Sequence, residues 1–301
     1  MSDSISSQLN TRGRWPIFIA MCALAATIIY PLFFVVITSL RSNVDYKRDP
    51  FGLPAEWTIS NYIELWDEYG VGRAFLNSLF VSLSAVSLIL IFATLAGYAL
   101  AKLPVFGSKF FTATFVSVML IPGPVLIIPI YLVLARLGIV GDYAGLILVY
   151  LATGLPFAIF FLTLTFRAIP EEILDAAKVD GAGFFRTLWS IIRPMGASGI
   201  ATLAVLQFLG TWNELIFALI LIPDAQMRLL TPTLASIGKR FVTDQPLTSA
   251  GLFITALVPL LLLAFASKYM YMSLPARKPG RSRRGSLNPR MNGPSTRASA
   301  K

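Results

Sequence analysis

The chain has 301 residues, 56% of them hydrophobic and 13% charged, and it carries a formal net charge of +10. This composition is typical of a polytopic membrane protein and excludes an ordinary soluble domain. The sequence has no histidine, which excludes His-based metal sites, and its single cysteine, Cys22, is expected in a helix core without a disulfide. No Walker A, H-E-x-x-H or G-x-S-x-G pattern occurs, so we expect no catalytic residue, metal or cofactor in this chain.

Six stretches with few or no charges follow one another along the chain, each more than 20 residues long. A stretch of that length crosses a bilayer as a helix. The first continues past any signal-peptide cleavage site, so we interpret it as a retained anchor. The sequence therefore predicts an all-α polytopic membrane protein with six transmembrane helices. The stretches lie between residues 14 and 41, 73 and 102, 109 and 136, 142 and 167, 193 and 223, and 244 and 268.

The distribution of lysine and arginine predicts three regions and an orientation. Residues 1–14 form a cytoplasmic N-terminus, residues 15–273 the membrane domain, and residues 274–301 a basic, disordered cytoplasmic tail. The tail has eight basic residues from Arg277 onward and no acid, so we expect it near anionic lipid headgroups and expect no nucleic-acid partner. Without the tail, the side with both termini has nine basic residues against eight, so the orientation depends on the tail.

The second and third stretches differ from ordinary membrane helices. Small residues between positions 82 and 97 predict that the second helix packs closely on a neighbour. The third contains Pro122, Gly123, Pro124 and Pro129, which remove backbone hydrogen bonds that lipid cannot replace. We therefore expect a helix broken beside protein or a cavity. Broken helices line the substrate path in many transporters, but a purely structural kink is equally open.

The region between the fourth and fifth stretches, Ile169 to Pro194, is the longest polar interruption in the second half of the chain. Pro170 and the acids after it fit the first turn of a helix. The triplet Gly181-Ala182-Gly183 ends that helix, and Asp180 is a candidate cap for the next. One apolar stripe then precedes Pro194, which gives a helix–kink–helix; an amphipathic loop on the membrane surface is the alternative. The stripe comprises Phe184, Phe185, Leu188, Trp189 and Ile192.

The fifth stretch contains an acid, Glu214, beside Trp212 and Asn213. A charge at the bilayer centre costs roughly 2.5 kcal/mol or more, so this side chain should face a cavity, a partner or the interface. We assign Trp212, Asn213 and Glu214, together with Pro122 and Pro124, to a translocation path. The alternative is that Glu214 lies close enough to the outer headgroups to be hydrated.

The polar region resembles the EAA signature of binding-protein-dependent ABC importers, with the spacing of the signature kept throughout. Two positions depart from it, because Asp175 replaces the usual glutamate and Arg193 stands where an apolar residue is usual. The resemblance covers about residues 30–273, and the chain lacks the family's usual short C-terminal end that contacts the ATPase. The matching residues are Asp175, Ala176, Ala177, Asp180, Gly181, Ala182, Ile191 and Pro194.

The resemblance implies a permease subunit of a carbohydrate importer with the type I importer fold and a cytoplasmic coupling helix between helices four and five. It implies two ATPase subunits that bind ATP and Mg, a second homologous permease subunit, an extracytoplasmic solute-binding protein and a location in the bacterial inner membrane. A sugar, an oligosaccharide, a polyol and a sugar phosphate all remain open as substrates. The residues expected to contact the ATPase are Asp175, Ala176, Ala177, Asp180, Gly181, Ala182, Phe185 and Arg186.

An alternative function from another class is a secondary transporter or channel. Glu214 would then be an ion or substrate site, and substrate would move without ATP. A requirement for ATP separates the two functions.

Overall fold

The computed structural model describes residues 14–237 and 244–271, and within these ranges the regular elements are helices. The predicted N-terminal segment up to residue 13 and the basic tail from residue 274 lie outside the described residues. The first eight elements are α2 (Arg14–Ser39), α3 (Asn43–Arg48), α4 (Ser60–Asp67), α5 (Val71–Lys102), α6 (Ser108–Met119), η1 (Gly123–Leu126), α7 (Ile127–Leu137) and α8 (Tyr143–Arg167). The others are α9 (Glu171–Val179), α10 (Phe184–Thr187), η2 (Leu188–Ile192), α11 (Arg193–Met195), α12 (Ala197–Trp212), α13 (Ile216–Leu221), α14 (Leu230–Ser236) and α16 (Gln245–Tyr271).

Four helices are each long and apolar enough to cross a membrane alone, namely α2, α5, α8 and α16. Two further spans are possible as bent pairs. Helix α6 and the η1–α7 segment meet at 91°, and the α10–α11 segment meets α12 at 77°. The described residues therefore contain four to six spans, and six are reached only when each bent pair counts as one.

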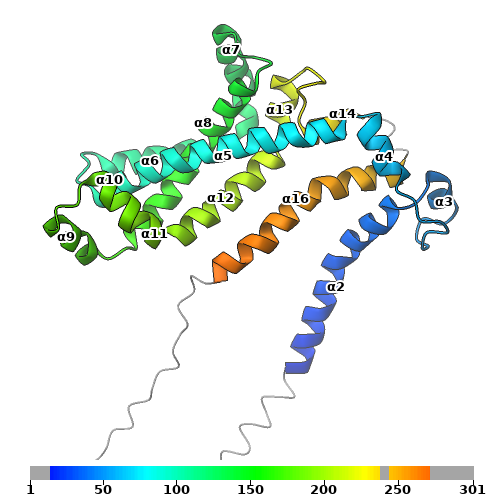
Figure 1. The fold of residues 1–301 in the computed structure, drawn as a ribbon, viewed down its shortest axis with the longest axis horizontal. Helices are drawn as coiled ribbons and strands as arrows, with labels where there is room; N and C mark the ends of the chain where they lie inside the picture. The colour runs from blue at the N-terminus through cyan, green and yellow to red at the C-terminus, as the bar shows by residue number, and fades with distance from the viewer. Residues whose placement is uncertain (1–13, 238–243, 272–301) are drawn as a thin grey trace, which may run out of the picture.

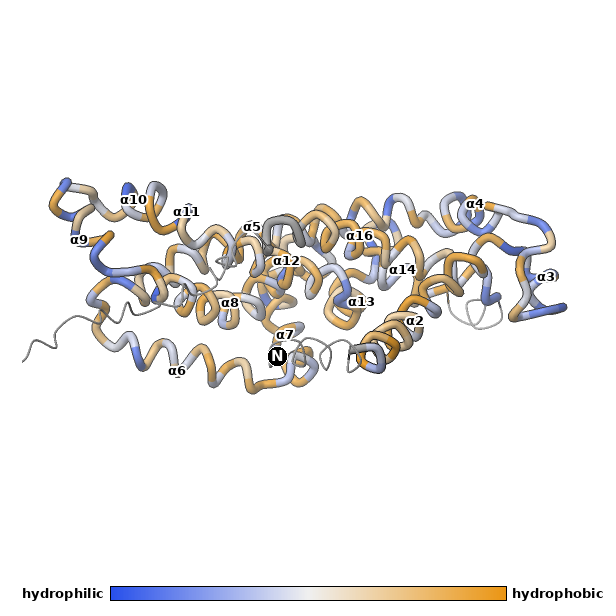
Figure 2. Tube along the Cα trace, turned by 90° about the horizontal axis from the view of Figure 1, so that it is seen from below, coloured by the Kyte–Doolittle hydropathy of each residue, from blue (hydrophilic) through white to orange (hydrophobic). Residues whose placement is uncertain are grey.

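The two polar regions of the fold lie at opposite ends of the long helix α5. Helices α3 and α4 lie near its first residue and α9 and α10 near its last (Figure 1). The helices between them are mostly hydrophobic, whereas both ends carry hydrophilic segments (Figure 2). This separation is the one expected of a bundle whose middle lies in lipid and whose ends lie in water.

Helices α5 and α8 form the centre of the packing. A Cβ on Gly97 of α5 would lie 3.0 Å from Cβ of Leu162 and 3.2 Å from the backbone nitrogen of Thr163, both in α8. Ala93, one turn earlier, is fully buried. Small side chains thus let the two backbones approach closely, as the residues between positions 82 and 97 predict.

Helix α2 stands apart from this centre and contacts mainly α16 (Figure 1). Its side chains from Trp15 to Leu32 are exposed, and so is Cys22, which corrects the expectation of a cysteine in a helix core. The end of α2 is fixed by polar contacts. The Asn61 side-chain amide donates to the backbone carbonyls of Ser39 and Arg41, each at 2.8 Å.

Candidate coupling surface and translocation path

Helix α9 is the first half of the predicted helix–kink–helix. It begins at Glu171, one residue later than the sequence pattern suggests, because Pro170 takes the extended N-cap position instead of the first helical turn. Glu171 and Glu172 occupy the first turn, where the helix dipole favours negative charge. Local sequence therefore accounts for where this helix starts.

The turn after α9 depends on glycine. Gly181 has φ +72°, a left-handed conformation that a residue with a Cβ adopts at a cost of about 1–2 kcal/mol. The N–H of Ala182 donates to the carbonyl of Ala177 at 2.9 Å and closes the end of the helix. A Cβ at Gly181 would meet nothing within 4 Å among the described residues, so the turn is open on its outer side in this part of the chain.

The side chains of α9 divide into an inner and an outer face. Leu174 and Ala177 are each 6% exposed, so Ala177 packs inward, and we remove it from the set of partner contacts. Asp175 faces outward and forms an ion pair with Lys178 at 2.8 Å, with both side chains more than two-thirds exposed. Ala176 and Asp180 are exposed beside this pair. The outer face is therefore small and charged.

The second half of the unit runs through α10, η2 and α11, and its details correct three expectations. Gly183, not Asp180, takes the N-cap position of α10. The helix continues past Pro194 to Met195. The expected single stripe is two rows, because Leu188 and Ile192 are buried whereas Phe185 and Trp189 are exposed. The two rows are offset by one residue, and the π-helical segment η2 shifts the winding between them.

The whole unit is attached to the ends of α5 and α8. Lys102, the last residue of α5, donates from Nζ to the carbonyl of Ile169 at 2.6 Å. The ring of Tyr98 lies 5.0 Å from that of Phe184, and Leu174 joins the same buried cluster. These contacts attach the segment from Ile169 to Phe184 to the central helix pair.

The predicted break in the third span is confirmed by the 91° bend between α6 and η1–α7. Pro122 precedes the short η1 helix, Pro124 lies within it, and both side chains are exposed. A Cβ on Gly123 would lie 3.7 Å from the ring of Phe217, which belongs to α13. The break therefore lies beside α13, so that segments about ninety positions apart meet here.

The Glu214 carboxylate is held by four hydrogen bonds of this chain. Its Oε1 accepts from the backbone N–H groups of Ile216 and Phe217 at 2.8 and 2.9 Å, and its Oε2 accepts from that of Ala218 at 3.0 Å. The Tyr150 hydroxyl of α8 donates to Oε2 at 3.0 Å. The acid thus satisfies the first N–H groups of α13 at the positive end of that helix. These four hydrogen bonds satisfy the carboxylate, so they account for a charged side chain in this apolar region without a bound ion.

Trp212 and Asn213 take different positions. Trp212 is 2% exposed, stacks on Phe208 at 5.6 Å and donates its indole N–H to the carbonyl of Thr255 at 3.0 Å. It thereby joins α12 to α16, and we remove it from the candidate path. Asn213 follows the last residue of α12 and is exposed.

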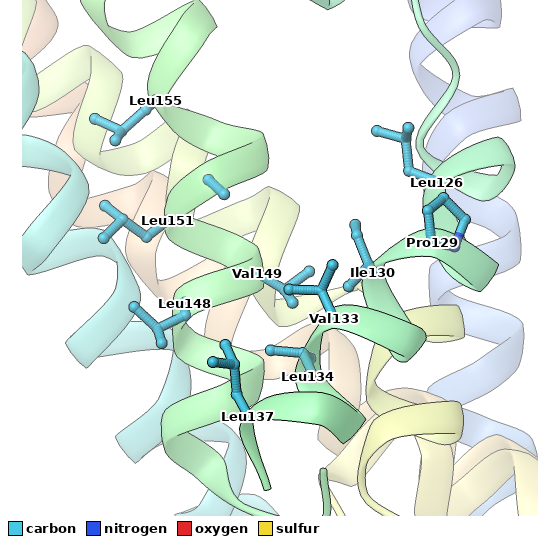
Figure 3. Close-up of a pocket in the computed structure, with 11 residues that line it drawn as sticks. Leu126, Pro129, Ile130, Val133, Leu134, Leu137, Leu148, Val149, Leu151 and Leu155 are labelled. Atoms are coloured by element: carbon cyan, nitrogen blue, oxygen red, sulfur yellow. The ribbon is translucent and has the colours of Figure 1, made fainter. Parts of the chain in front are cut away.

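An apolar groove of about 520 Å³ lies between α7 and α8 (Figure 3). Its lining, which includes Pro129, Leu134 and Leu148, is entirely apolar. A carbohydrate carries hydroxyl groups that lose hydrogen bonds to water in such a groove. The groove suits lipid or a neighbouring helix and is not a carbohydrate site.

Two residues that the sequence reasoning did not select contribute contacts, one to each site. The Tyr150 hydroxyl donates to the Glu214 carboxylate, and Lys102 donates to the carbonyl of Ile169, just before α9. Tyr150 is a phenol in a mostly apolar helix, and a buried phenol hydroxyl usually finds a partner. Lys102 has no comparable sequence signal, because its partner is a backbone carbonyl 67 residues away.

Known proteins resemble this chain along most of its length. The diacetylchitobiose uptake system permease protein NgcG of Streptomyces coelicolor is 32% identical over 239 residues, which cover 78% of each chain. The melibiose/raffinose/stachyose import permease protein MelC of Bacillus subtilis is 27% identical over 245 residues, which cover 81% of this chain and 88% of that one. A crystal structure of a bacterial ABC transporter involved in the import of the acidic polysaccharide alginate has a chain with the same fold. It has a TM-score of 0.73 at 20% identity, with 89% of this chain and 98% of that chain covered.

The family described as binding-protein-dependent transport system inner membrane component matches residues 72–277, which is more than half of the chain. The match includes α5 to α16 and therefore both candidate sites. Together with the apolar helices, it shows a multi-pass membrane protein. The chain belongs to the family of binding-protein-dependent transport system inner membrane components.

Proposed function

We propose that this chain is the transmembrane permease subunit of an ATP-driven importer for carbohydrate. The family supports the class of importer, and the saccharides named for two relatives support the substrate class. The chain itself performs no chemistry; ATP and Mg²⁺ bind in two partner ATPase subunits. A second homologous permease subunit completes the membrane part, and an extracytoplasmic binding protein delivers the substrate.

In this proposal the chain crosses the bacterial inner membrane six times in the type I importer fold, through α2, α5, the α6–α7 pair, α8, the α12 part of the second bent pair, and α16. Both termini and the loop 169–194 lie in the cytoplasm. The α3–α4 end and the segment after α13 then lie outside, where the binding protein docks. The hydrophilic segments at the two ends of the bundle support this placement (Figure 2).

The observation that carries the proposal is the exposed α9–turn–α10 unit at one end of the bundle (Figure 1). The outer face has a small side chain at Ala176 and open space around Gly181, so a partner surface can approach the backbone. Closure of the ATPase subunits would push this face, and the Lys102 and Tyr98 contacts would pass the movement to α5 and α8. The proposed contact residues are Asp175, Ala176, Asp180, Gly181, Ala182, Phe185 and Arg186.

The translocation path is proposed to pass the α6–η1 break. Pro122, Pro124 and Asn213 are exposed near this break and near the start of α13. Glu214 would act there by fixing α13 and not by binding substrate, since its oxygens already accept four hydrogen bonds. A broken helix leaves backbone N–H and C=O groups without intrahelical partners. Such groups occur where protein or a water-filled cavity lies beside them, not lipid, and there they can contact a substrate.

The test is ATP-dependent uptake in proteoliposomes that contain the chain with its partner permease, ATPase subunits and loaded binding protein. Uptake that needs both ATP and the binding protein is expected. Uptake driven by an ion gradient without ATP would instead support the secondary transporter. Orientation is tested by labelling Ser190→Cys in a Cys22→Ser background, and reaction with an impermeant reagent outside intact cells would contradict it.

A further inference from the structure

A second pocket, also of about 520 Å³, lies between α5 and the α10–η2 segment, toward the end of the bundle that carries the α9–turn–α10 unit. Aliphatic side chains form half of its wall, among them Leu90, Ile91 and Leu95 of α5 and Leu188 of η2, and two aromatic rings add to the apolar lining. Walls of this kind match the acyl chain of a lipid and offer few partners to the many hydroxyl groups of a saccharide.

Three polar side chains interrupt the apolar wall. The Arg193 guanidinium lies 4.8 Å from the centre of the Trp189 ring, and no carboxylate of the described residues lies within 4 Å of it. The hydroxyl groups of Ser87 and Thr94 line the same pocket and, within the described part of the chain, bond to no protein group. One unpaired cation and two free hydroxyl groups beside an aliphatic wall match an anionic headgroup attached to an acyl chain.

The direction of the α10–α11 segment places the cation at the membrane boundary. The segment is bent by 77° from α12. With residues 169–194 in the cytoplasm, as in the proposed function, it would run across the direction of α12 at the bilayer surface. Phe185 and Trp189 are 65% and 57% exposed on one side of it. Aromatic side chains next to arginine on a surface helix are typical of the headgroup region.

We propose that this pocket binds an anionic phospholipid of the inner leaflet, with its phosphate at Arg193 and an acyl chain along Ile91 and Leu95. The inference rests on the cytoplasmic placement of the coupling unit in the proposed function. Arg193 is one of the two residues at which this sequence departs from the EAA signature, so the cation of the site belongs to this chain and not to the general pattern. The lipid would fill the space between α5 and the α10–η2 segment.

The experiment replaces Ile91 with the photoreactive residue benzoylphenylalanine in the full chain, expressed with its partners in cell membranes. After illumination, mass spectrometry identifies what is attached. Phe92 is the matched control position, because it is the next residue on α5, is 48% exposed against 54% for Ile91, and does not line the pocket. We expect phospholipid adducts at both positions, with the anionic fraction about fivefold higher at Ile91.

The substitution Arg193→Gln should lower the anionic fraction at Ile91 to that at Phe92, whereas Arg186→Gln, which changes an arginine outside the pocket, should leave it unchanged. An adduct with another polypeptide would show that a subunit covers the pocket and would overturn the proposal. Equal lipid ratios at the two positions, attached saccharide or no adduct at Ile91 would overturn it as well. These results do not depend on transport, so a failure here differs from a failure of ATP-dependent uptake.

Discussion

The two ends of the bundle differ in how their charged side chains are satisfied. At the α3–α4 end, Arg41 is 1% exposed and donates to the carboxylate of Asp45 and to the backbone carbonyls of Asp45, Asp49 and Gly52. At the α9–α11 end, Asp175 pairs with Lys178 on an open surface, where an ion pair contributes at most about 1 kcal/mol. Charges satisfied within the chain hold a fold, whereas charges left at an open surface are available to a partner.

The substitution Arg41→Met should have the largest effect on stability. It removes the four hydrogen bonds that hold residues 41–52 together, and the Asp45 carboxylate loses its charged donor and keeps only the backbone N–H of Ala55 among the donors described for its Oδ2. We expect rapid cleavage of the segment between α2 and α4 by proteinase K. Arg48→Met is the control, because Arg48 is an exposed arginine in α3, the helix that follows Arg41. Equal protease resistance of the two variants would contradict a structural role for Arg41.

Glu214→Ala should have the next largest effect, because three backbone N–H groups of α13 and the Tyr150 hydroxyl lose their acceptor. We expect about 2–3 kcal/mol of lost stability, read as a lower Tm in detergent, and reduced uptake with subunit assembly retained. Glu214→Gln keeps an acceptor oxygen and should recover most of the Tm. If Glu214→Ala keeps the Tm and normal transport kinetics, Glu214 is only a hydrated acid near the interface.

Lys102→Met should have a smaller effect on stability and a specific effect on coupling. It removes the 2.6 Å hydrogen bond to the Ile169 carbonyl, worth about 1.5–3 kcal/mol with a charged donor and less where water replaces it. ATP hydrolysis stimulated by loaded binding protein should fall severalfold while the subunits remain assembled. Lys109→Met, an exposed lysine of α6, is the control. An unchanged stimulated rate in Lys102→Met would show that force does not pass through this contact.

The smallest predicted effect is a pH dependence at the α3–α4 end. The hydrogen bond from Arg41 lowers the pKa of the Asp45 carboxyl below its usual value. The ionised form is favoured by folding, so its contribution is complete above the ordinary pKa and is lost as the pH falls through the lowered one. Hydrogen exchange of the α3 amides, corrected for intrinsic rate, should accelerate only in strong acid. Asp45→Asn should remove that acid dependence, and an unchanged profile in this variant would contradict the assignment.

The sequence alone predicted the elements that depend on local patterns. The triplet Gly181-Ala182-Gly183 predicted the end of the helix, where Gly181 takes a left-handed conformation, and Pro122 with Pro124 predicted the broken helix. Both follow from backbone conformations that only particular residues adopt or disrupt. The cost of a charge in an apolar stretch likewise identified Glu214 as an acid that should face a cavity, a partner or the interface.

Contacts between distant segments could not be predicted in this way. Nothing in a linear pattern pairs Glu214 with Tyr150 or Lys102 with the carbonyl of Ile169, and both contacts decide how the sites are held. Helical spacing also failed to separate the buried row of the α10–η2 segment, Leu188 and Ile192, from its exposed row, Phe185 and Trp189. Trp212 was selected as a neighbour of Glu214, and Ala177 for its place in the EAA signature, but each is buried by its own chain.

The most direct test of the central claim, that the α9–turn–α10 unit transmits ATPase closure, compares two glycines. Gly181 and Gly138 have φ +72° and +70°, and at each a Cβ would meet nothing within 4 Å; Gly138 lies after α7, near the opposite end of α8. An aspartate at either position has the same backbone cost, but only at Gly181 would it hold a partner away. The measurement is ATP hydrolysis by the purified complex with loaded binding protein. We predict that stimulation is lost in Gly181→Asp and kept in Gly138→Asp, whereas full subunit stoichiometry and full stimulation in Gly181→Asp would contradict the account.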